Sequence, residues 1–356
     1  MKSLLLALSW LAVIATLIPL HSGDAWWIRG FDFPRVQIAV VAVVLLLLIV
    51  LVVDDLKFYD YLTITALFGS IGLQVWQIFP YTPFAPVQVQ ASTEHEPEST
   101  FYLLIANVLM DNRNVAGLKT QIQAVDPDTV LVVEVNRWWE SQLQSLQTDY
   151  PYLVAHPLDN TYGMILYSRL PLIDPHVRFI VQDDVPSIHT RVRLRSGTEI
   201  ELHCVHPRPP SPVHHDRSTE RDAELILVGK EVENSNSPVL VTGDLNDVAW
   251  SRSTRLFQKV SGLLDPRVGR GIFGTFHARY PLMRWPLDHV FHSNHFTLIA
   301  LKTLDYFGSD HLPVFIALNH EPAAQIDQDE LDAPSQAERQ EMRETVQKAT
   351  KEQPRQ

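Results

Sequence analysis

The chain passes through three kinds of sequence: a strongly apolar N-terminal quarter, a long region of short apolar runs separated by polar ones, and a charged end. The apolar quarter contains three long runs, at about 4–20, 36–53 and 61–79. Each is close to the roughly 20 residues that a helix needs to cross a bilayer about 30 Å thick. Tryptophan and tyrosine stand near their ends, as is typical of membrane interfaces. The pattern predicts a three-helix transmembrane region over 1–86.

The three runs differ in how strongly they support this prediction. The second has one polar residue, Gln37, and no polar face, which excludes a helix half-buried in a soluble core. The third is the weakest, because Gln74 and Gln77 interrupt it. The first could be a signal peptide with a weak cleavage site near Ala25, but its apolar run exceeds the usual roughly 7–15 residues. We favour an uncleaved helix.

Basic residues leave the membrane orientation almost balanced. Lys2 and Lys57 would lie on one side of the bilayer, and Arg29 and Arg35 on the other. A short basic N-terminus normally stays inside, and three crossings then place the rest of the chain outside. A cleaved signal peptide followed by two spans leads to the same side. We therefore expect a multi-pass membrane protein whose main domain is extracytoplasmic.

Two segments flank the main domain. Residues 87–100 follow several prolines and carry Ser, Thr and Glu, which is typical of a linker. Residues 320–356 are rich in Gln, Glu, Asp, Lys and Arg, and a charged, disordered tail is expected there. A helix from about Ser335 to Lys351 is possible, but the segment has almost no apolar side chains and nothing there could bury it.

Between 101 and 319, apolar runs of strand length alternate with helix-like segments. The predicted helices are Val115–Val125, Trp138–Leu146, Asp216–Val232 and Ser251–Val260. The predicted strands are Phe101–Asn107, Thr129–Val135, Met164–Tyr167, Arg178–Val181, Ile188–Leu194, Glu199–Val205, Val239–Thr242, Ile272–Phe276, Leu287–Phe291, Phe296–Leu301 and Val314–Leu318. Strands mixed with hairpins and few crossover helices indicate an α/β fold of the α+β type, in which two mixed sheets pack face to face under outer helices.

Composition narrows the range of partners. The net charge is −12, and the main domain lacks the basic surface that non-specific binding to duplex DNA requires. This favours a small or locally presented phosphate over long DNA. The single cysteine, Cys204, excludes an intramolecular disulfide and a cysteine-based zinc site. His214 and His215 lack the helical spacing of a histidine zinc site, so we expect them to be solvated.

Polar side chains stand where several apolar strands end. Glu134 follows an entirely apolar strand, and Asn107 holds the matching position on the strand before it. An unpaired carboxylate there would be costly to desolvate, whereas Mg²⁺ or Mn²⁺ would accept its oxygens as ligands. The alternatives are an exposed strand end for Glu134 and a turn for Asn107. The pattern favours a site for a hard divalent cation.

Further candidates for chemistry follow later strands. In Gly-Asp-Leu-Asn, Asp244 could deprotonate or orient a water and Asn246 could hold a phosphate oxygen, unless the two simply cap a helix. His311 and Asp288 would form a carboxylate–imidazole pair, in which His311 acts as a base or contacts a phosphoryl group. His206 is a second imidazole that could donate a proton or bind phosphate, or be an ordinary loop histidine.

Jointly these residues resemble the endonuclease/exonuclease/phosphatase superfamily, which includes deoxyribonuclease-like nucleases, inositol polyphosphate phosphatases and neutral sphingomyelinases. The resemblance covers about residues 101–319. It rests on Asn107, Glu134, His206, Gly-Asp-Leu-Asn at 243–246, Leu-Asp-His-Val at 287–290, Gly-Ser-Asp-His-Leu-Pro at 308–313 and the run Tyr162–Arg169. It implies a four-layer α/β sandwich and phosphoester hydrolysis dependent on Mg²⁺ or Mn²⁺.

The resemblance also implies a role for each site residue. Asn107, Glu134 and Asp310 would be metal-site residues. Asp244 and Asn246 would position the nucleophile and the phosphate. The remaining catalytic groups would be His206, His311 and the carboxylate that orients His311, Asp288.

Two departures from the family pattern leave the substrate class open. Val133 precedes Glu134 where a Gln is often found, and His289 follows Asp288 where an aromatic is frequent. The membrane segments are similar to those of a bacterial membrane-anchored branch, which implies a bacterial inner membrane. We expect cleavage of phosphodiesters in nucleic acid or lipid head groups. The alternatives are a phosphomonoesterase and a non-catalytic membrane scaffold, and the complete set of catalytic side chains argues against the scaffold.

Overall fold

The computed structural model describes residues 1–93, 96–211, 216–233, 235–328 and 331–352, in two compact units. The first unit comprises Met1–Pro86 together with Pro210–Ser218, and the second comprises Val87–Pro209 and Thr219–Gln356. His214 and His215, predicted to be solvated, lie outside the described residues.

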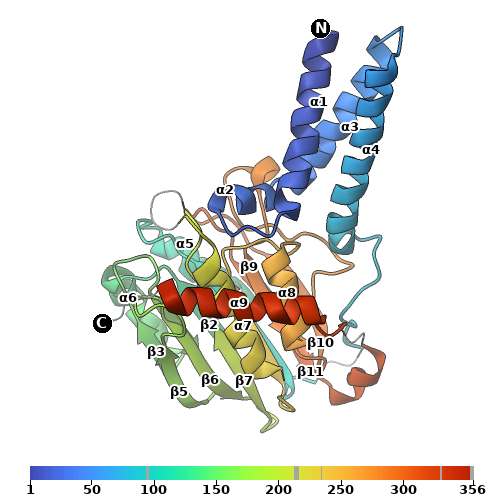
Figure 1. The fold of residues 1–356 in the computed structure, drawn as a ribbon. Helices are drawn as coiled ribbons and strands as arrows, with labels where there is room; N and C mark the ends of the chain where they lie inside the picture. Colours follow the sequence, from blue (N-terminus) through green and yellow to red (C-terminus); the bar gives the residue numbers. More distant parts are fainter. Residues whose placement is uncertain (94–95, 212–215, 234, 329–330, 353–356) are drawn as a thin grey trace. The chain divides into compact units, whose positions relative to one another are not determined.

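The first unit is a bundle of three long helices (Figure 1). They are α1 (Lys2–Leu17), α3 (Arg35–Val52) and α4 (Phe58–Ile78), with a short α2 (Trp26–Arg29) and the 3₁₀ turns η1 (Ile18–Leu20), η2 (Gly30–Asp32) and η3 (Phe79–Tyr81). With their 3₁₀ extensions, three helices are long and apolar enough to span a membrane, at Lys2–Leu20, Arg35–Val52 and Phe58–Tyr81. Many of their large apolar side chains face outward, as lipid contact requires.

The interior of the bundle explains the glutamines of the third run. Gln74 is fully buried, where it donates to Thr16 Oγ1 at 3.1 Å and accepts from Arg35 at 3.3 Å. Arg35 in turn pairs with Asp32 at 2.5 Å. Polar groups on such helices turn inward because lipid offers them no partner. The glutamine that weakened the sequence pattern therefore joins α1, α3 and α4.

The second unit contains two mixed β-sheets (Figure 1). One has the strand order β10-β11-β1-β2-β4-β3 and the other β5-β6-β7-β8-β9. The first sheet is built from β1 (Thr100–Asn107), β2 (Thr129–Val133), β3 (Tyr152–His156), β4 (Met164–Ser168), β10 (Phe296–Thr303) and β11 (Val314–His320). The second is built from β5 (Leu172–Arg178), β6 (Ser187–Arg193), β7 (Glu199–Cys204), β8 (Val239–Asp244) and β9 (Asp288–His292).

Three apolar clusters define the layers of this unit. One lies between the sheets and takes side chains from both, including Leu103, Leu166, Leu202 and Leu240. A second packs α5 (Val115–Val125) and α6 (Arg137–Leu143), with η4 (Gln144–Thr148), on the first sheet. A third packs α7 (Thr219–Val232) and α8 (Arg252–Ser261) on the second sheet. The predicted four-layer sandwich of two packed mixed sheets is confirmed.

The C-terminal segment corrects the prediction of a disordered tail over 336–352. Here α9 (Gln336–Glu352) lies across α7 and α8 (Figure 1) and buries Met342 and Ala349. Lys259 donates to Glu338 at 2.7 Å, and Arg252 pairs with Glu341. Two well-placed apolar side chains and ion pairs across helices dock an otherwise charged helix, which a count of apolar residues does not reveal.

Other boundaries also differ from the prediction. Part of the proposed linker belongs to the second unit, because Val89 is buried between the sheets and Ala91 pairs with Leu298 of β10. Strand β3 was missed. The runs 179–181 and 272–276 are not strands, although Phe276 forms isolated bridges to Trp285 and His311. The short 3₁₀ turns η5 (Pro281–Met283) and η6 (Pro322–Asp327) complete the unit.

Candidate active site

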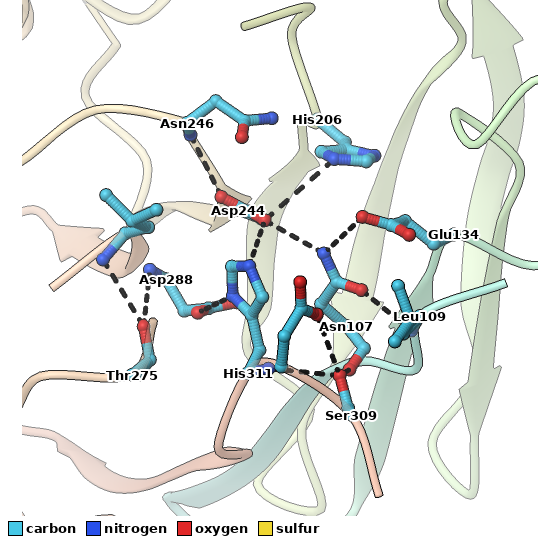
Figure 2. A network of polar contacts seen from close by, with 12 residues as sticks. Asn107, Leu109, Glu134, His206, Asp244, Asn246, Thr275, Asp288, Ser309 and His311 are labelled. Carbon is cyan, nitrogen blue, oxygen red and sulfur yellow. Dashed lines mark hydrogen bonds and ion pairs between the residues drawn. The ribbon is translucent and has the colours of Figure 1, made fainter. Parts of the chain in front are cut away.

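One edge of the sandwich gathers polar side chains from both sheets (Figure 2). In the first sheet, β1 ends at Asn107 and Glu134 follows the end of β2. In the second sheet, β8 ends at Asp244, which pairs in register with Asp288 at the start of the antiparallel β9. The loop between β10 and β11 adds His311. The parallel strands β1 and β2 both end at this edge, and the antiparallel β9 begins there beside the end of β8. Residues that are distant in sequence therefore meet at this edge.

Asn107 joins the acidic groups of the two sheets. Its side-chain amide donates to Glu134 Oε1 at 2.8 Å and to Asp244 Oδ2 at 3.0 Å, while its Oδ1 accepts from the Leu109 backbone at 3.0 Å. Burial raises the pKa of Glu134 to about 7, with the charges of Asp244 and Asp310 adding to the effect. The donated hydrogen bond and His311 oppose that shift. The amide thus holds two like-charged groups at close range.

His311 lies between two carboxylates. Its Nδ1 is 2.8 Å from Asp288 Oδ2, and its Nε2 is 3.5 Å from Asp244 Oδ2. Burial by itself would lower the pKa of His311, but Asp244 and Asp288 outweigh burial and raise the pKa to about 10. Burial also raises the pKa of Asp244. The two carboxylates therefore favour the protonated form of His311, in which both ring nitrogens carry a proton.

His206 and Asn246 complete the side of the site formed by the second sheet. His206 Nε2 is 3.9 Å from Asp244 Oδ2, and burial lowers the pKa of this imidazole against the influence of Asp244. Asn246 donates its backbone N–H to Asp244 Oδ1 at 2.9 Å. Its side-chain amide donates one N–H to the Pro207 carbonyl at 3.1 Å, which leaves the second N–H of the amide to hold a phosphate oxygen.

Asp310 lies on the side of the site formed by the first sheet. Its charge contributes to the pKa of both Glu134 and His311, and its backbone carbonyl accepts from Ala278 at 2.7 Å. The neighbouring Ser309 donates to the Asn107 carbonyl at 2.8 Å and accepts from the His311 backbone at 3.1 Å. All eight site residues predicted from the sequence therefore surround one place: Asn107, Glu134, His206, Asp244, Asn246, Asp288, Asp310 and His311.

Several supporting residues escaped sequence reasoning. Thr275 Oγ1 accepts from the backbone of Asp288 at 3.4 Å, and the Phe276 ring packs against His311 with centroids 5.0 Å apart. Tyr162 packs against His206 at 5.7 Å, and Arg208 lies over the Tyr162 ring at 4.9 Å. A single sequence contains no signal for these contacts, except that Tyr162 opens a run already singled out.

Backbone geometry at the site depends on one glycine. Gly243 has φ +143°, and a Cβ there would lie 1.9 Å from the Val205 carbonyl oxygen. Only glycine lets β8 pass β7 this closely. Asn246 and Glu134 also have positive φ, at 52° and 60°, in a region that residues other than glycine occupy at a cost in energy. The Gly-Asp-Leu-Asn turn therefore has a specific backbone conformation that requires Gly243, and it is not an ordinary helix cap.

A family comparison agrees with this geometry. The model of the "Endonuclease/Exonuclease/phosphatase family" matches residues 104–311. The chain belongs to this family. Its members hydrolyse phosphoester bonds, so the protein is a phosphoester hydrolase by family. No curated protein sequence is significantly similar to the chain.

Solved structures share the family fold at low sequence identity. D. rerio TDP2 complexed with a single-strand DNA product is 16% identical, with a TM-score of 0.51, over 62% of this chain and 99% of that one. An endonuclease/exonuclease/phosphatase protein from Beutenbergia cavernae is 18% identical, with a TM-score of 0.51, over 63% and 72%. The human Nocturnin catalytic domain with bound sulfate is 16% identical, with a TM-score of 0.50, over 62% and 93%. These likenesses establish the fold.

The family depends on divalent metals, and the residues at this edge fit such an ion. Glu134, Asp244, Asp288 and Asp310 bring four carboxylates together. In the described residues, the ion-pair partners of Asp244 and Asp288 are the imidazoles of His206 and His311. Asp244, Asp288 and His311 also form a group whose ligand atoms lie within 4.8 Å of one another. Such an excess of acidic oxygens suits a hard cation.

Proposed function

We propose that this protein is a membrane-anchored phosphodiesterase that uses Mg²⁺ or Mn²⁺. The observation that supports this most directly is the Asp288–His311–Asp244 chain, with its 2.8 Å and 3.5 Å contacts, next to the acids of the first sheet. Asn107, Glu134 and Asp310 would hold the cation through oxygen atoms. When bound, a divalent cation would neutralise charge on the phosphoryl oxygens.

The proton chemistry is divided among three groups. Asp244, whose pKa is raised by burial, accepts or orients the proton of the attacking water. His311, held as an imidazolium by two carboxylates, donates to a phosphoryl oxygen or to the leaving group. His206, whose pKa is lowered, offers a neutral N–H to phosphate. Asn246 keeps Asp244 in place through its backbone N–H at 2.9 Å.

Hydrolysis of a chromogenic diester tests the proposed reaction. The full-length protein in detergent should hydrolyse bis-p-nitrophenyl phosphate with Mg²⁺ or Mn²⁺, and EDTA should abolish this turnover. A diesterase should hydrolyse the monoester p-nitrophenyl phosphate more slowly. Faster turnover of the monoester would instead indicate a phosphatase. The absence of metal-dependent turnover on either compound would support the alternative of a non-catalytic scaffold.

A lipid head group is the substrate favoured by one surface feature. The loop after Ala278 exposes Tyr280 by 59%, Leu282 by 86% and Met283 by 53%. This loop adjoins the site, because Ala278 donates to the Asp310 carbonyl at 2.7 Å. Exposed apolar side chains at a site entrance are suited to contact with lipid. The net charge of −12 gives little attraction to nucleic acid.

Direct competition between substrates tests this preference. The full-length protein should release head groups from phospholipid vesicles faster than it nicks plasmid DNA or cleaves RNA. Changing Leu282 and Met283 to Ser should slow vesicle hydrolysis and leave the soluble diester unaffected. Equal loss on both substrates, or preferential cleavage of nucleic acid, would contradict the lipid proposal. Single-strand DNA is the alternative, since the TDP2 structure contains a DNA product.

We also propose the membrane topology. The three candidate spans would make this a multi-pass protein of a bacterial inner membrane, with its catalytic unit outside the cytoplasm. Tags fused after the catalytic unit should report this side: alkaline phosphatase should be active there and green fluorescent protein should be dark. The reverse pattern would place the catalytic unit in the cytoplasm.

A further inference from the structure

A row of three histidines crosses the second sheet away from the active site. His176 of β5 pairs in register with His189 of β6, which pairs with His203 of β7. Their sequence neighbours Ile188 and Leu202 belong to the core between the sheets. Because side chains alternate along a strand, the histidines lie on the opposite face, which α7 partly covers. Phosphoester hydrolysis makes no use of this row.

The hydrogen bonds around the row define which ring nitrogens carry lone pairs. Ser187 Oγ donates to the Arg178 carbonyl at 3.2 Å, so it accepts from His189 Nε2 at 2.9 Å. His189 Nδ1 is then unprotonated, and it accepts from His203 Nδ1, 2.7 Å away. This assignment leaves a second lone pair on His203 Nε2, which is buried without a hydrogen-bond partner among the described residues. The Nδ1 atoms of the two imidazoles therefore face each other across one proton.

A carboxylate completes the group. Glu231 of α7, His189 and His203 present ligand atoms that all lie within 4.8 Å of one another. Glu231 is bound by Arg178 at 2.6 Å and 2.7 Å, and these side chains are 40% and 37% exposed. An ion pair this exposed contributes little stability, so Glu231 can exchange Arg178 for another cation.

We propose that His189, His203 and Glu231 form a second metal site, selective for a borderline transition-metal ion such as Zn²⁺. Two imidazoles and one carboxylate are a ligand set that Zn²⁺ accepts, with water as a fourth ligand. Binding replaces the hydrogen bond between the two Nδ1 atoms. The His203 proton moves from Nδ1 to Nε2, which faces Glu201 Oε2 at 3.9 Å. In the metal-bound form the N–H of Nε2 would thus point toward the Glu201 carboxylate.

The location of the site indicates a structural role. The metal would tie β6 and β7 to α7. His203 precedes His206 by three residues on the strand that leads into the active site. Helix α7 also carries the buried Arg221, which donates to the Asn246 carbonyl at 2.8 Å. Zn²⁺ binding would therefore stiffen the scaffold under the catalytic loop without touching the reacting atoms.

Metal titration of the full-length protein in detergent tests the site. Chelator-stripped protein, and a Glu134→Gln/Asp310→Asn variant with a weakened catalytic site, should both bind Zn²⁺ in calorimetry and melt at a higher temperature with it. Co²⁺ should produce the visible absorption of a four-coordinate nitrogen and oxygen site in both. His189→Ala should lower Zn²⁺ affinity by at least about 100-fold, since a direct ligand is lost.

Two further variants serve as controls. One tests whether a loss of Zn²⁺ binding results from misfolding, and the other tests whether the loss of any histidine would weaken binding. His203→Asn keeps an N–H toward His189 and should fold, yet lose the Co²⁺ spectrum. His295→Ala removes a half-buried histidine outside the group and should bind Zn²⁺ like the parent. Zn²⁺ binding that survives His203→Asn, or that disappears with the Glu134→Gln/Asp310→Asn change, would overturn the proposal.

Discussion

The catalytic unit contains two groups of histidines, one at the edge of the sandwich and one on a sheet face. Their surroundings favour opposite protonation states of the imidazole. At the sheet edge, His311 lies between Asp244 and Asp288, which raise its pKa to about 10 despite burial. On the sheet face, burial lowers the pKa of His189 to about 2, with the neighbouring His203 adding to the effect. The carboxylates around His311 favour its protonated form, whereas burial beside His203 favours the neutral form of His189. The surrounding charges decide which role the residue takes.

Strand position accounts for the difference in surroundings. Strand ends release the chain into turns, so carboxylates and amides from several strands can converge around one point, as Asn107, Glu134 and Asp244 do. Strand faces instead place directly paired residues side by side, as with His176, His189 and His203. An edge therefore collects oxygen atoms suited to hard cations, whereas a face can align imidazoles suited to borderline ones.

Removing His311 should have the largest effect and would sharpen this contrast. In His311→Ala, kcat for bis-p-nitrophenyl phosphate should fall by about 10³-fold, because a general acid and a charge partner of Asp244 are lost together. His203→Asn should leave kcat within about threefold of the parent under metal-buffered conditions. Similar losses in both variants would mean that the groups are not functionally separate.

Changing Glu134 should affect metal dependence most. Glu134→Gln keeps an oxygen near the Asn107 amide but removes a charge, so the Mg²⁺ or Mn²⁺ concentration for half-maximal activity should rise by about 10- to 100-fold. Titrating activity against each metal measures the change. An unchanged metal requirement, together with a lower kcat, would place Glu134 in proton chemistry instead.

Arg221 links the two groups through α7, and its replacement should have an intermediate effect. Arg221 is fully buried and reaches Asn246, Asp222 at 2.9 Å and Asp247 at 3.0 Å. Lys cannot make this forked set of contacts, so Arg221→Lys should lower kcat by about tenfold with KM little changed. A change in KM alone would show that Arg221 acts on substrate binding and not on the catalytic loop.

The smallest effect is expected for helix α9, which contributes no residue to either histidine group. Changes in α9 therefore serve as a baseline for the effects predicted above. The hydrogen bond from Lys259 lowers the pKa of Glu338 to about 2, from an ordinary value of 4.5. The ion pair therefore stabilises docking above about pH 4.5, and this contribution is lost as the pH falls toward 2. Hydrogen exchange over 336–352 should accelerate modestly in that window, and less so in Glu338→Gln. Equal acceleration in both proteins would assign the loosening to other acids.

Local patterns predicted much of the molecule because they depend on neighbours in sequence. The strand β1 and the helix α5 have the expected bounds within one residue, and the three candidate membrane spans follow from continuous apolar runs. Polar residues ending apolar strands identified Asn107, Glu134 and Asp244, since a charged group after a buried strand needs a partner. The proposed catalytic roles of these residues remain predictions that the experiments above address.

Only the tertiary structure decided the contacts between segments that are far apart in the chain. The amino-acid sequence by itself determined the ends of strands such as β1, the three long apolar helices and the family. It did not place His176, His189 and His203 in one row, because strand register depends on pairing between segments. Nor did it show the docking of α9, whose burial depends on Met342 and Ala349 meeting α7 and α8. Such contacts join segments that are distant in sequence. Their stabilising free energy exists only once folding has brought the segments together, so local sequence patterns do not reveal it.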